Sequence, residues 1–227
     1  MKLSPRLQKI ADLIETGARL ADVGTDHAHL PIYLLEQGIA SSVIATDLHA
    51  GPLMAAKKNA AGMIGIDFRL ADGLSAVCPH EVDTIVVAGM GGETIAHVLK
   101  EAPWTKEKGY RLILQVQSKV LELMTFLADN GYQIQAQHLV KDAGRIYPIY
   151  EVQGGQMPPM EAENTYIHAS VLERKDPLLK EYLAKQIEKN VLIEQGLKKS
   201  NTSKEEVAVY EEEIKRLRKL EQEVQLW

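Results

Sequence analysis

The chain lacks several features that would point to common functions. Cys78 is its only cysteine, which excludes an intrachain disulfide and a cysteine-based zinc site. No apolar run approaches the length of a membrane span. The first residues, Met-Lys-Leu-Ser-Pro-Arg-Leu, have no apolar signal-peptide region. We therefore expect a soluble, cytoplasmic protein with no membrane partner.

Positive charge is also scarce. The 227 residues carry 26 Lys and Arg against 31 Asp and Glu, a net charge of −5. This balance does not by itself suggest a nucleic-acid binder, so any basic surface must be a local patch. Candidate members of a phosphate-facing patch are Arg6, Arg19, Lys57, Lys58, Lys106, Lys108, Arg111, Lys141 and Arg145. Each pair taken alone is more often simply solvated.

Apolar residues make up 45% of the chain, enough for a core, and they follow an alternating pattern. Ser4 and Pro5 predict the start of a first helix that Gly17 ends. Short apolar runs predict five strands, over 20–23, 42–46, 68–71, 84–88 and 111–116, with helices between them. Residues 132–140 and 146–152 predict a closing antiparallel pair. The pattern predicts an α/β fold, a Rossmann-like doubly wound sheet of the class I methyltransferase type.

A second domain is expected after the pattern breaks near Gly154-Gly155 and Pro158-Pro159. We place the boundary between 1–157 and 158–227. Beyond it, apolar residues at helical spacing predict two helices, the second opened by a capping box from Ser203 to Glu206. A short polar linker makes them a coiled-coil-like helical hairpin. Its mixed charges leave open whether it clamps RNA or joins subunits, and we slightly favour a monomer.

Residues Leu20 to Pro31 form the most informative stretch. An apolar run delivers Asp22, turns at Gly24 and enters a helix, the layout of a nucleotide site at a strand end. Asp26 stands where a dinucleotide fingerprint has its second glycine. A carboxylate there repels a diphosphate and attracts a sulfonium or ammonium. The turn therefore favours a cationic nucleoside ligand, of which S-adenosylmethionine is the common example.

Polar residues and glycines follow three further strands. Asp47 comes 25 residues after Asp22, the spacing at which an acidic residue meets ribose hydroxyls. Asp72 is expected to accept from the adenine amine of the cofactor, and the glycines after Ala88 to lie at the reacting group. A single acidic residue at a strand end is often only a helix N-cap. The cofactor-binding set we predict is Asp22, Gly24, Thr25, Asp26, His27, Asp47, Leu48, Asp72, Gly73, Ala88 and Gly89.

Several of these strings together resemble the bacterial tRNA (adenine-N1)-methyltransferase family that modifies adenine 22. The resemblance covers residues 4–155 and is carried by Asp22-Val-Gly-Thr-Asp-His-Ala-His-Leu-Pro, Gly51-Pro52, Asp72-Gly73-Leu74, Ala88-Gly-Met-Gly-Gly and Leu112-Ile-Leu-Gln. It implies a class I methyltransferase domain, S-adenosylmethionine as cofactor and tRNA as substrate. After Gln115 the family usually continues Pro-Asn, whereas this chain has Val116-Gln117.

The chemistry expected of such an enzyme needs positioning more than acid–base work, because adenine N1 is already a nucleophile at neutral pH. We assign Asp26 as the main catalytic carboxylate, with Gly89, Met90 and Gly91 as the loop that approaches the base. Met90 is expected to pack on the base, although a plain core role is equally consistent with its type. Asp26 has an alternative role as a helix N-cap.

Other interpretations stay open at this point. One is a methyltransferase for another nucleic acid or a small molecule. A second is an NAD-binding oxidoreductase, against which Asp26 argues, and a third is a non-catalytic RNA-binding module. A metal site built from His27, His29 and His49 with Asp26 is disfavoured, because the spacing matches no standard ligand set.

Overall fold

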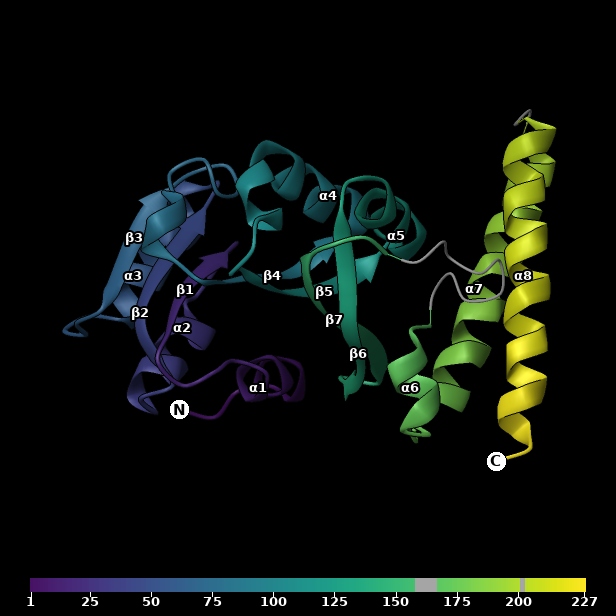
Figure 1. The fold of residues 1–227 in the computed structure, drawn as a ribbon, viewed down its shortest axis with the longest axis horizontal. Helices are drawn as coiled ribbons and strands as arrows, with labels where there is room; N and C mark the ends of the chain where they lie inside the picture. The colour runs from purple at the N-terminus through teal and green to yellow at the C-terminus, as the bar shows by residue number, and fades with distance from the viewer. Residues whose placement is uncertain (158–166, 201–202) are drawn as a thin grey trace. The chain divides into compact units, whose positions relative to one another are not determined.

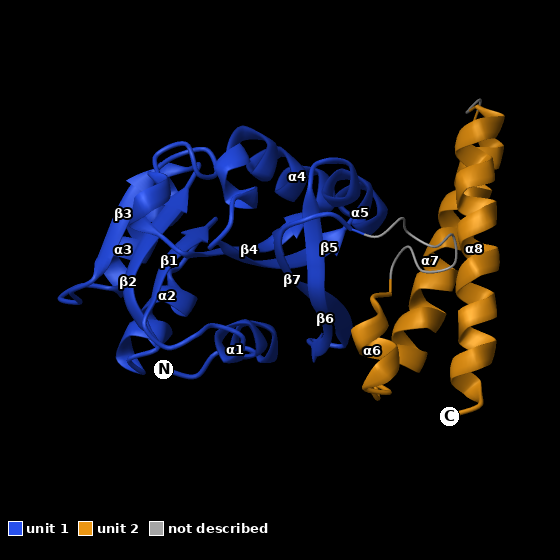
Figure 2. Cartoon of the chain, viewed as in Figure 1, with its two compact units in different colours: residues 1–157 blue, residues 158–227 orange. Residues whose placement is uncertain are grey.

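The computed structural model describes residues 1–157, 167–200 and 203–227. Two compact units divide the chain, Met1–Met157 and Pro158–Trp227 (Figure 2). Pro158 and Pro159, which we placed near the domain boundary, lie outside the described residues. The candidate site lies entirely in the first unit.

The first unit is built on one seven-stranded sheet with the strand order β3-β2-β1-β4-β5-β7-β6 (Figure 1). The pairs from β3 through β5 are parallel, and β7 pairs antiparallel with both β5 and β6. This arrangement confirms the predicted class I methyltransferase fold. The strands are β1 (Ala18–Val23), β2 (Ala40–Asp47), β3 (Ile66–Leu70), β4 (Thr84–Gly91), β5 (Arg111–Ser118), β6 (Tyr132–Asp142) and β7 (Arg145–Gly154).

The order places β1 beside β4, at the switch point of the sheet. Strands to one side of β1 follow in the order β2, β3, and strands to the other side begin with β4. In open α/β sheets, ligands bind outside the carboxyl ends of the strands at such a point. The carboxyl ends of β1 and β4 carry Asp22 and Ala88, so the topology brings two of the predicted motifs together.

Helices cover both faces of the sheet. Figure 1 shows α1 and α2 on one side and α4 and α5 on the other. On the first side, buried residues of α1 and α2, among them Ile10 and Leu34, share a core with Leu20 and Val43 of the sheet. The helices are α1 (Pro5–Asp12), α2 (His29–Glu36), α3 (Ala50–Asn59), α4 (Gly92–Glu101) and α5 (Val120–Asp129), with 3-10 turns η1 (Pro79–Glu81) and η2 (Pro103–Lys106).

The first helix starts as predicted and ends earlier than predicted. The Ser4 hydroxyl accepts a hydrogen bond from the Leu7 N–H at 3.4 Å, and Pro5 occupies the first turn. The helix then stops at Asp12, with Leu13 as its C-cap, rather than continuing to Gly17. Ile14 is nevertheless buried. The apolar spacing was therefore a good guide to burial and a poor guide to the helix end.

The second unit contains a helical hairpin. Its elements are α6 (Ala169–Glu173), α7 (Leu179–Lys199) and α8 (Lys204–Gln225), and α7 and α8 pack together. Leu179, Leu183, Ile214 and Leu217 are buried, as their spacing predicts. The Ser203 hydroxyl caps α8 by accepting from the Glu206 N–H at 3.2 Å. Among the helices that the structure describes, none has both the length and the apolar character to span a membrane.

Candidate cofactor and substrate site

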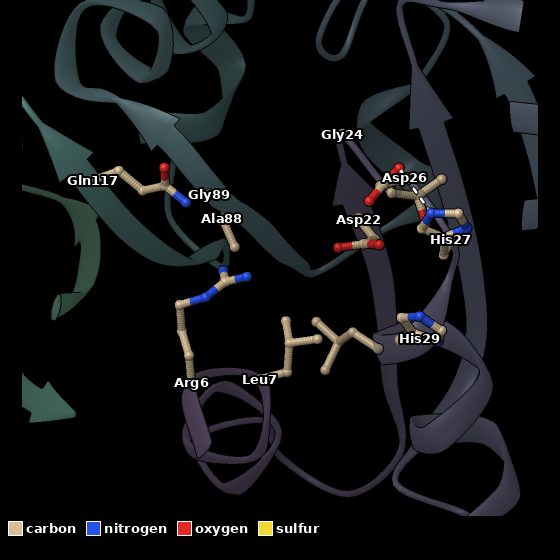
Figure 3. Close-up of a pocket in the computed structure, with 12 residues that line it drawn as sticks. Arg6, Leu7, Asp22, Gly24, Asp26, His27, His29, Ala88, Gly89 and Gln117 are labelled. Carbon is tan, nitrogen blue, oxygen red and sulfur yellow. Dashed lines mark ion pairs between the residues drawn. The ribbon is translucent and has the colours of Figure 1, made fainter. Parts of the chain in front are cut away.

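A cavity of about 310 Å³ opens at the carboxyl ends of β1 and β4 (Figure 3). This volume falls in the range of small-molecule sites. Three segments far apart in the sequence supply its walls: the first turns of α1, the turn from β1 into α2, and the ends of β4 and β5. The lining residues are Arg6, Leu7, Asp22, Gly24, Thr25, Asp26, His27, His29, Leu30, Ala88, Gly89 and Gln117.

The turn from β1 into α2 has a left-handed backbone at three places: Gly24 (φ +74°), Asp26 (φ +51°) and Ala28 (φ +54°). It is fixed to β2, because the N–H groups of Gly24 and Thr25 both donate to the Thr46 carbonyl at 2.9 Å. Ala28, not Asp26, is the N-cap of α2, and no side chain caps that helix. The alternative role of Asp26 as an N-cap is therefore wrong. Its carboxylate is not used in capping, and Asp26 lines the cavity.

Asp22 is a buried carboxylate at the end of β1, with 6% of its surface exposed. Its pKa is raised from 3.8 to about 6, mainly by burial and to a lesser degree by the negative charge of nearby Asp47, while a hydrogen bond with the Thr25 side chain opposes the shift. Burial makes the ionised form of Asp22 unfavourable. A positively charged ligand beside Asp22 would stabilise that ionised form. The electrostatics of the cavity thus favour a cationic group at this point.

Asp47 holds the turn in place through its side chain. One carboxylate oxygen accepts from the Asp26 N–H at 3.2 Å and the other from the His49 N–H at 2.9 Å. Each oxygen has two acceptor positions, so one position on each remains for a ligand hydroxyl. Leu48, the next residue, is 57% exposed. It can offer an apolar surface beside the carboxylate.

The ends of β2 and β3 are tied together next to the cavity. The Ala71 N–H donates to the Asp47 carbonyl at 2.9 Å, and the Thr46 hydroxyl donates to the Gly73 carbonyl at 2.9 Å. Gly73 has φ +56° and packs against Val98, where a Cβ would come within 3.1 Å. Asp72 is exposed. These residues form a continuous edge, although the cavity lining does not include Asp47, Leu48, Asp72 or Gly73.

At β4 the structure corrects an expectation. We expected the strand to end at Ala88, but it continues to Gly91 and keeps pairing with β5. In the pairing of β4 with β5, Ala88 lies opposite Gln115 and Met90 lies opposite Val116, so Gly89 has no partner residue on β5. Gly89 has φ +81°, and its N–H donates to the Gln115 side-chain oxygen at 3.0 Å. The glycine-rich run is thus a bulged strand rather than a free loop.

Met90 and Gly91 are not among the residues that line the cavity. A Cβ on Gly24 would collide with the terminal methyl of Met90, so this side chain packs over the β1–α2 turn. Gly91 is the N-cap of α4 and pairs with Ser118. Contact of Met90 with a substrate base stays a prediction.

Five of the lining residues are not in the predicted cofactor-binding set: Arg6, Leu7, His29, Leu30 and Gln117. Arg6 comes from a helix more than 80 residues away from Gly89 in the chain. Its Nη1 donates to the Gln115 side-chain oxygen at 2.7 Å, the same oxygen that accepts from the Gly89 N–H. These residues come together only in the folded chain, and no local sequence pattern indicates that they are neighbours.

Two arginines of the predicted basic patch are already engaged in ion pairs. Arg19 contacts Asp83 at 3.2 Å, and Arg111 contacts Glu151 at 3.0 Å and Glu15 at 2.5 Å. Lys57 and Lys58, at the end of α3, are exposed. Any phosphate-facing patch therefore depends on lysines more than on these arginines.

His27 and His29 stack with ring centroids 5.6 Å apart. His27 Nε2 lies 3.7 Å from an Asp26 carboxylate oxygen. Among residues 1–157, 167–200 and 203–227, no group of three or more His, Cys, Asp or Glu residues is arranged to hold a metal ion. The histidines thus contribute to the wall of the cavity.

Comparison with known proteins agrees with this geometry. A family model described as a methyltransferase domain matches residues 3–150. The tRNA (adenine(22)-N(1))-methyltransferase of Bacillus subtilis is 35% identical over 158 residues, which cover 68% of this chain and 66% of that protein. The crystal structure of the B. subtilis M1A22 tRNA methyltransferase has a TM-score of 0.81 at 27% identity, with 98% of each chain covered.

A crystal structure from Streptococcus pneumoniae, solved in complex with S-adenosyl-L-methionine, is 32% identical. It has a TM-score of 0.81 and covers 96% of this chain and 99% of its own. Fold, cavity and family model together define the chain as a class I methyltransferase. Within that class, the chain belongs to the tRNA (adenine-22, N1)-methyltransferase family.

Proposed function

We propose that this protein transfers a methyl group from S-adenosylmethionine to N1 of adenine 22 in tRNA. The observation that carries the proposal is the acidic turn at the end of β1, where Asp22 and Asp26 face a cavity beside the glycine bulge of β4. This turn suits a cationic nucleoside, and relatives with the same fold are named as tRNA methyltransferases.

The residues present fit the cofactor. Gly24 and Gly89 have positive φ and leave the cavity wall without side chains at the two strand ends, so a ligand can approach the backbone closely. Asp22 supplies a negative charge for a cationic group. We assign the ribose hydroxyls to Asp47, one face of the cofactor's adenine to Leu48, and the edge of that ring to Asp72 and Gly73. Thr25, His27 and Ala88 complete the wall.

S-adenosylmethionine supplies an electrophilic methyl group attached to a positively charged sulfur. In the transfer, the N1 lone pair of adenine forms the new N–C bond while the C–S bond breaks and its electron pair stays on sulfur. No proton has to leave first, so no general base is needed. The product base carries a positive charge.

We propose that Asp26 is the catalytic residue of this step. Its carboxylate is exposed at the cavity wall, where it can accept from the adenine N6 amine and stabilise the charge developing on the ring. Gln117 lines the cavity beside Gly89 and adds a carboxamide on the side of the substrate base. It stands at the place where the family pattern has an amide, so an amide function is retained there.

We propose two further properties. A tRNA substrate implies a cytoplasmic protein, and exposed lysines such as Lys57 and Lys58 are candidates for phosphate contacts. The hairpin of α7 and α8 is a candidate RNA clamp, with the protein acting as a monomer of 25.2 kDa. Light scattering of the purified chain tests the last point, and a mass of twice that value would assign the hairpin to subunit contact instead.

The experiment that tests the activity uses unmodified tRNA, S-adenosylmethionine and nucleoside mass spectrometry. We expect 1-methyladenosine to accumulate with time and with the amount of enzyme. A different methylated nucleoside, or methylation of another class of RNA only, would show a methyltransferase with another target. RNA binding without any methyl transfer would favour a non-catalytic module, and saturable NAD binding in place of S-adenosylmethionine would favour an oxidoreductase.

A further inference from the structure

The hairpin of β6 and β7 continues beyond its pairing with β5, at the end of the sheet where the cavity opens. The last pair between β5 and β7 joins Gln115 to Ile149, whereas β6 and β7 stay paired as far as Asp142 and Arg145. Since β7 runs antiparallel to β5, its first residues lie toward the carboxyl end of β5. Residues 145–148 thus carry the hairpin roughly 13 Å past its pairing with β5, at about 3.4 Å per residue.

The tip of this hairpin is tightly folded and is seated on α1 (Figure 1). Ala143 and Gly144 form a two-residue turn with φ of +47° and +77°, the left-handed pair that a tight hairpin requires. The Asp142 carboxylate accepts from the Arg6 N–H at 3.4 Å, in the first turn of α1. Buried residues of the hairpin and of α1 also belong to one core. Since Arg6 lines the cavity, the tip lies next to the cavity wall.

The tip presents positive charge to solvent. Lys141 and Arg145 are both exposed, and within the described residues the Arg145 side chain makes no hydrogen bond or ion pair. The only acidic residue between positions 130 and 150 is Asp142, which is already engaged at the start of α1. On a chain with a net charge of −5, an exposed cationic tip beside the cavity indicates a contact with an anionic ligand.

The acidic turn of the cavity is a poor place for the phosphates of a nucleic acid. Asp22 and Asp26 repel them, so a target base that enters the cavity must leave its sugar–phosphate backbone at the rim. Enzymes that act on a base take it out of the stack, and contacts to the neighbouring phosphates fix the position of the strand. The tip of β6 and β7 places two cations beside the part of the rim that α1 forms.

We propose that Lys141 and Arg145 bind the phosphates beside the target adenine and hold the extruded nucleotide over the cavity. The inference rests on the proposed methylation of tRNA, and it identifies the surface that holds the RNA strand beside the reacting base. Lysine binds a phosphate as a point charge, and arginine adds paired hydrogen bonds to two phosphate oxygens. A role in stability does not account for Arg145, because an exposed side chain without an ion pair in the described residues contributes little to folding.

Binding of full-length tRNA over a range of salt concentrations tests the contact. Arg145→Gln should weaken binding about 3- to 10-fold and reduce the slope of log affinity against log salt concentration by about 0.7 to 0.9. The double variant Lys141→Gln, Arg145→Gln should reduce that slope about twice as much. Affinity for S-adenosylmethionine should stay within about 2-fold of wild type, because neither residue lines the cavity.

Two control variants separate the position of the charge from its amount. Arg145→Lys keeps the charge and should retain the salt dependence of the wild type. Lys100→Gln removes an exposed positive charge from the last turn of α4, and it should leave tRNA binding unchanged. That helix starts at the carboxyl end of β4 and leads back toward the start of β5, so Lys100 lies away from the cavity end of the sheet. Melting curves of all variants should match the wild type.

A tRNA with one uncharged methylphosphonate linkage locates the contact on the RNA. With the linkage on one or the other side of nucleotide 22, at least one of the two tRNAs should bind the wild type about 3- to 10-fold more weakly. The double variant should bind that tRNA as tightly as it binds the unmodified one, because the contact is already lost. A linkage in the anticodon stem should affect the wild type and the double variant equally.

Several results would overturn the proposal. One is a double variant that binds tRNA with the affinity and salt dependence of the wild type. An equal loss in Lys100→Gln would assign the effect to net charge, and a parallel loss of cofactor affinity would mean that the hairpin only supports α1. Additive effects of the variant and both flanking linkages would place the contact elsewhere on the RNA. A protein that shows the expected RNA binding but methylates no tRNA would contradict the proposed function and leave this inference standing.

Discussion

Three carboxylates gather at the turn from β1 into α2. Asp22, Asp26 and Asp47 come from two strand ends and meet around one turn, where Asp47 accepts from the Asp26 N–H. The positions of Asp22 and Asp26 in the cavity could be predicted from the sequence, because Asp22 lies at the end of a buried strand and Asp26 in the turn after it. The support that Asp47 gives to the turn could not, since it depends on the side-chain geometry of the folded state.

The charge on Asp22 should make stability depend on pH. Its pKa is raised from 3.8 to about 6, so the folded state retains a proton that the unfolded state releases. The free energy of unfolding should therefore fall as pH rises from about 4 through 6, with about 1.4 kcal/mol of this loss between pH 5 and pH 7.5. Urea unfolding of the wild type and Asp22→Asn checks this, because the stability of the variant relative to wild type should rise by that amount.

Parallel pH profiles of the two proteins would contradict the assignment of a buried, destabilised carboxylate. The pH dependence of S-adenosylmethionine binding provides an independent control, because affinity should rise with pH while the free energy of unfolding falls. A cationic ligand restores the ionised form of Asp22, so the ligand should bind more weakly below pH 6 in the wild type. Asp22→Asn should show little of this dependence.

Asp26 should affect turnover rather than cofactor affinity. Its backbone is left-handed, with φ +51°, and asparagine tolerates this conformation, so Asp26→Asn removes the charge without straining the turn. We expect the single-turnover methylation rate to fall about 100- to 1,000-fold. Affinity for S-adenosylmethionine should stay within about 3-fold of wild type by calorimetry.

The exposed Asp129 at the end of α5 offers a matched control, because Asp129→Asn removes the same charge at a residue outside the cavity lining. It should leave both the rate and the affinity unchanged. If Asp26→Asn instead lost cofactor binding while the bound fraction reacted at the normal rate, Asp26 would belong to the binding machinery alone.

At the scale of elements, β4 and the β1–α2 turn act as one assembly. Glycines after Ala88 predicted a loop, because glycine-rich runs usually interrupt strands. The structure instead continues β4 by a bulge whose free N–H is satisfied by Gln115. The residue that makes this possible lies on the next strand, so the local sequence gives no signal of it.

Gly24→Ala should damage this assembly for two separable reasons. The backbone at φ +74° disfavours a side chain, and the new methyl would collide with the end of Met90. We expect thermal unfolding to show a loss of about 2–3 kcal/mol in stability. Adding Met90→Ala should restore the part that comes from the collision and leave a residual loss of about 1 kcal/mol from the backbone.

Measured ligand binding completes the comparison. The double variant should bind S-adenosylmethionine more tightly than Gly24→Ala alone. Additive losses in the double variant would show that Met90 does not pack over Gly24, and would return Met90 to its predicted role at the substrate base.

At the scale of the whole molecule, the sequence predicts the fold better than the site. Strands such as 84–88 and 111–116 are recognisable because buried parallel strands are continuous apolar runs, and their alternation with helices predicts a mostly parallel sheet. The order β3-β2-β1-β4-β5-β7-β6 comes from the structure alone. Arg6 and Gln117 were not assigned to the site, because residues brought together across 100 positions leave no pattern in the chain. The part of the cavity formed by the end of β1 and the turn after it could be predicted from the sequence. The part formed by Arg6 and Gln117 could not.

Position-resolved mapping of the methylated tRNA tests the central claim most directly. A methyl group on N1 blocks the Watson–Crick edge, so reverse transcription of tRNA treated with the enzyme and S-adenosylmethionine should stop at position 22. A tRNA in which adenine 22 is replaced by uracil should give no stop and accept no methyl group. Methyl transfer that persists in that tRNA, or a stop at another adenine, would contradict the account.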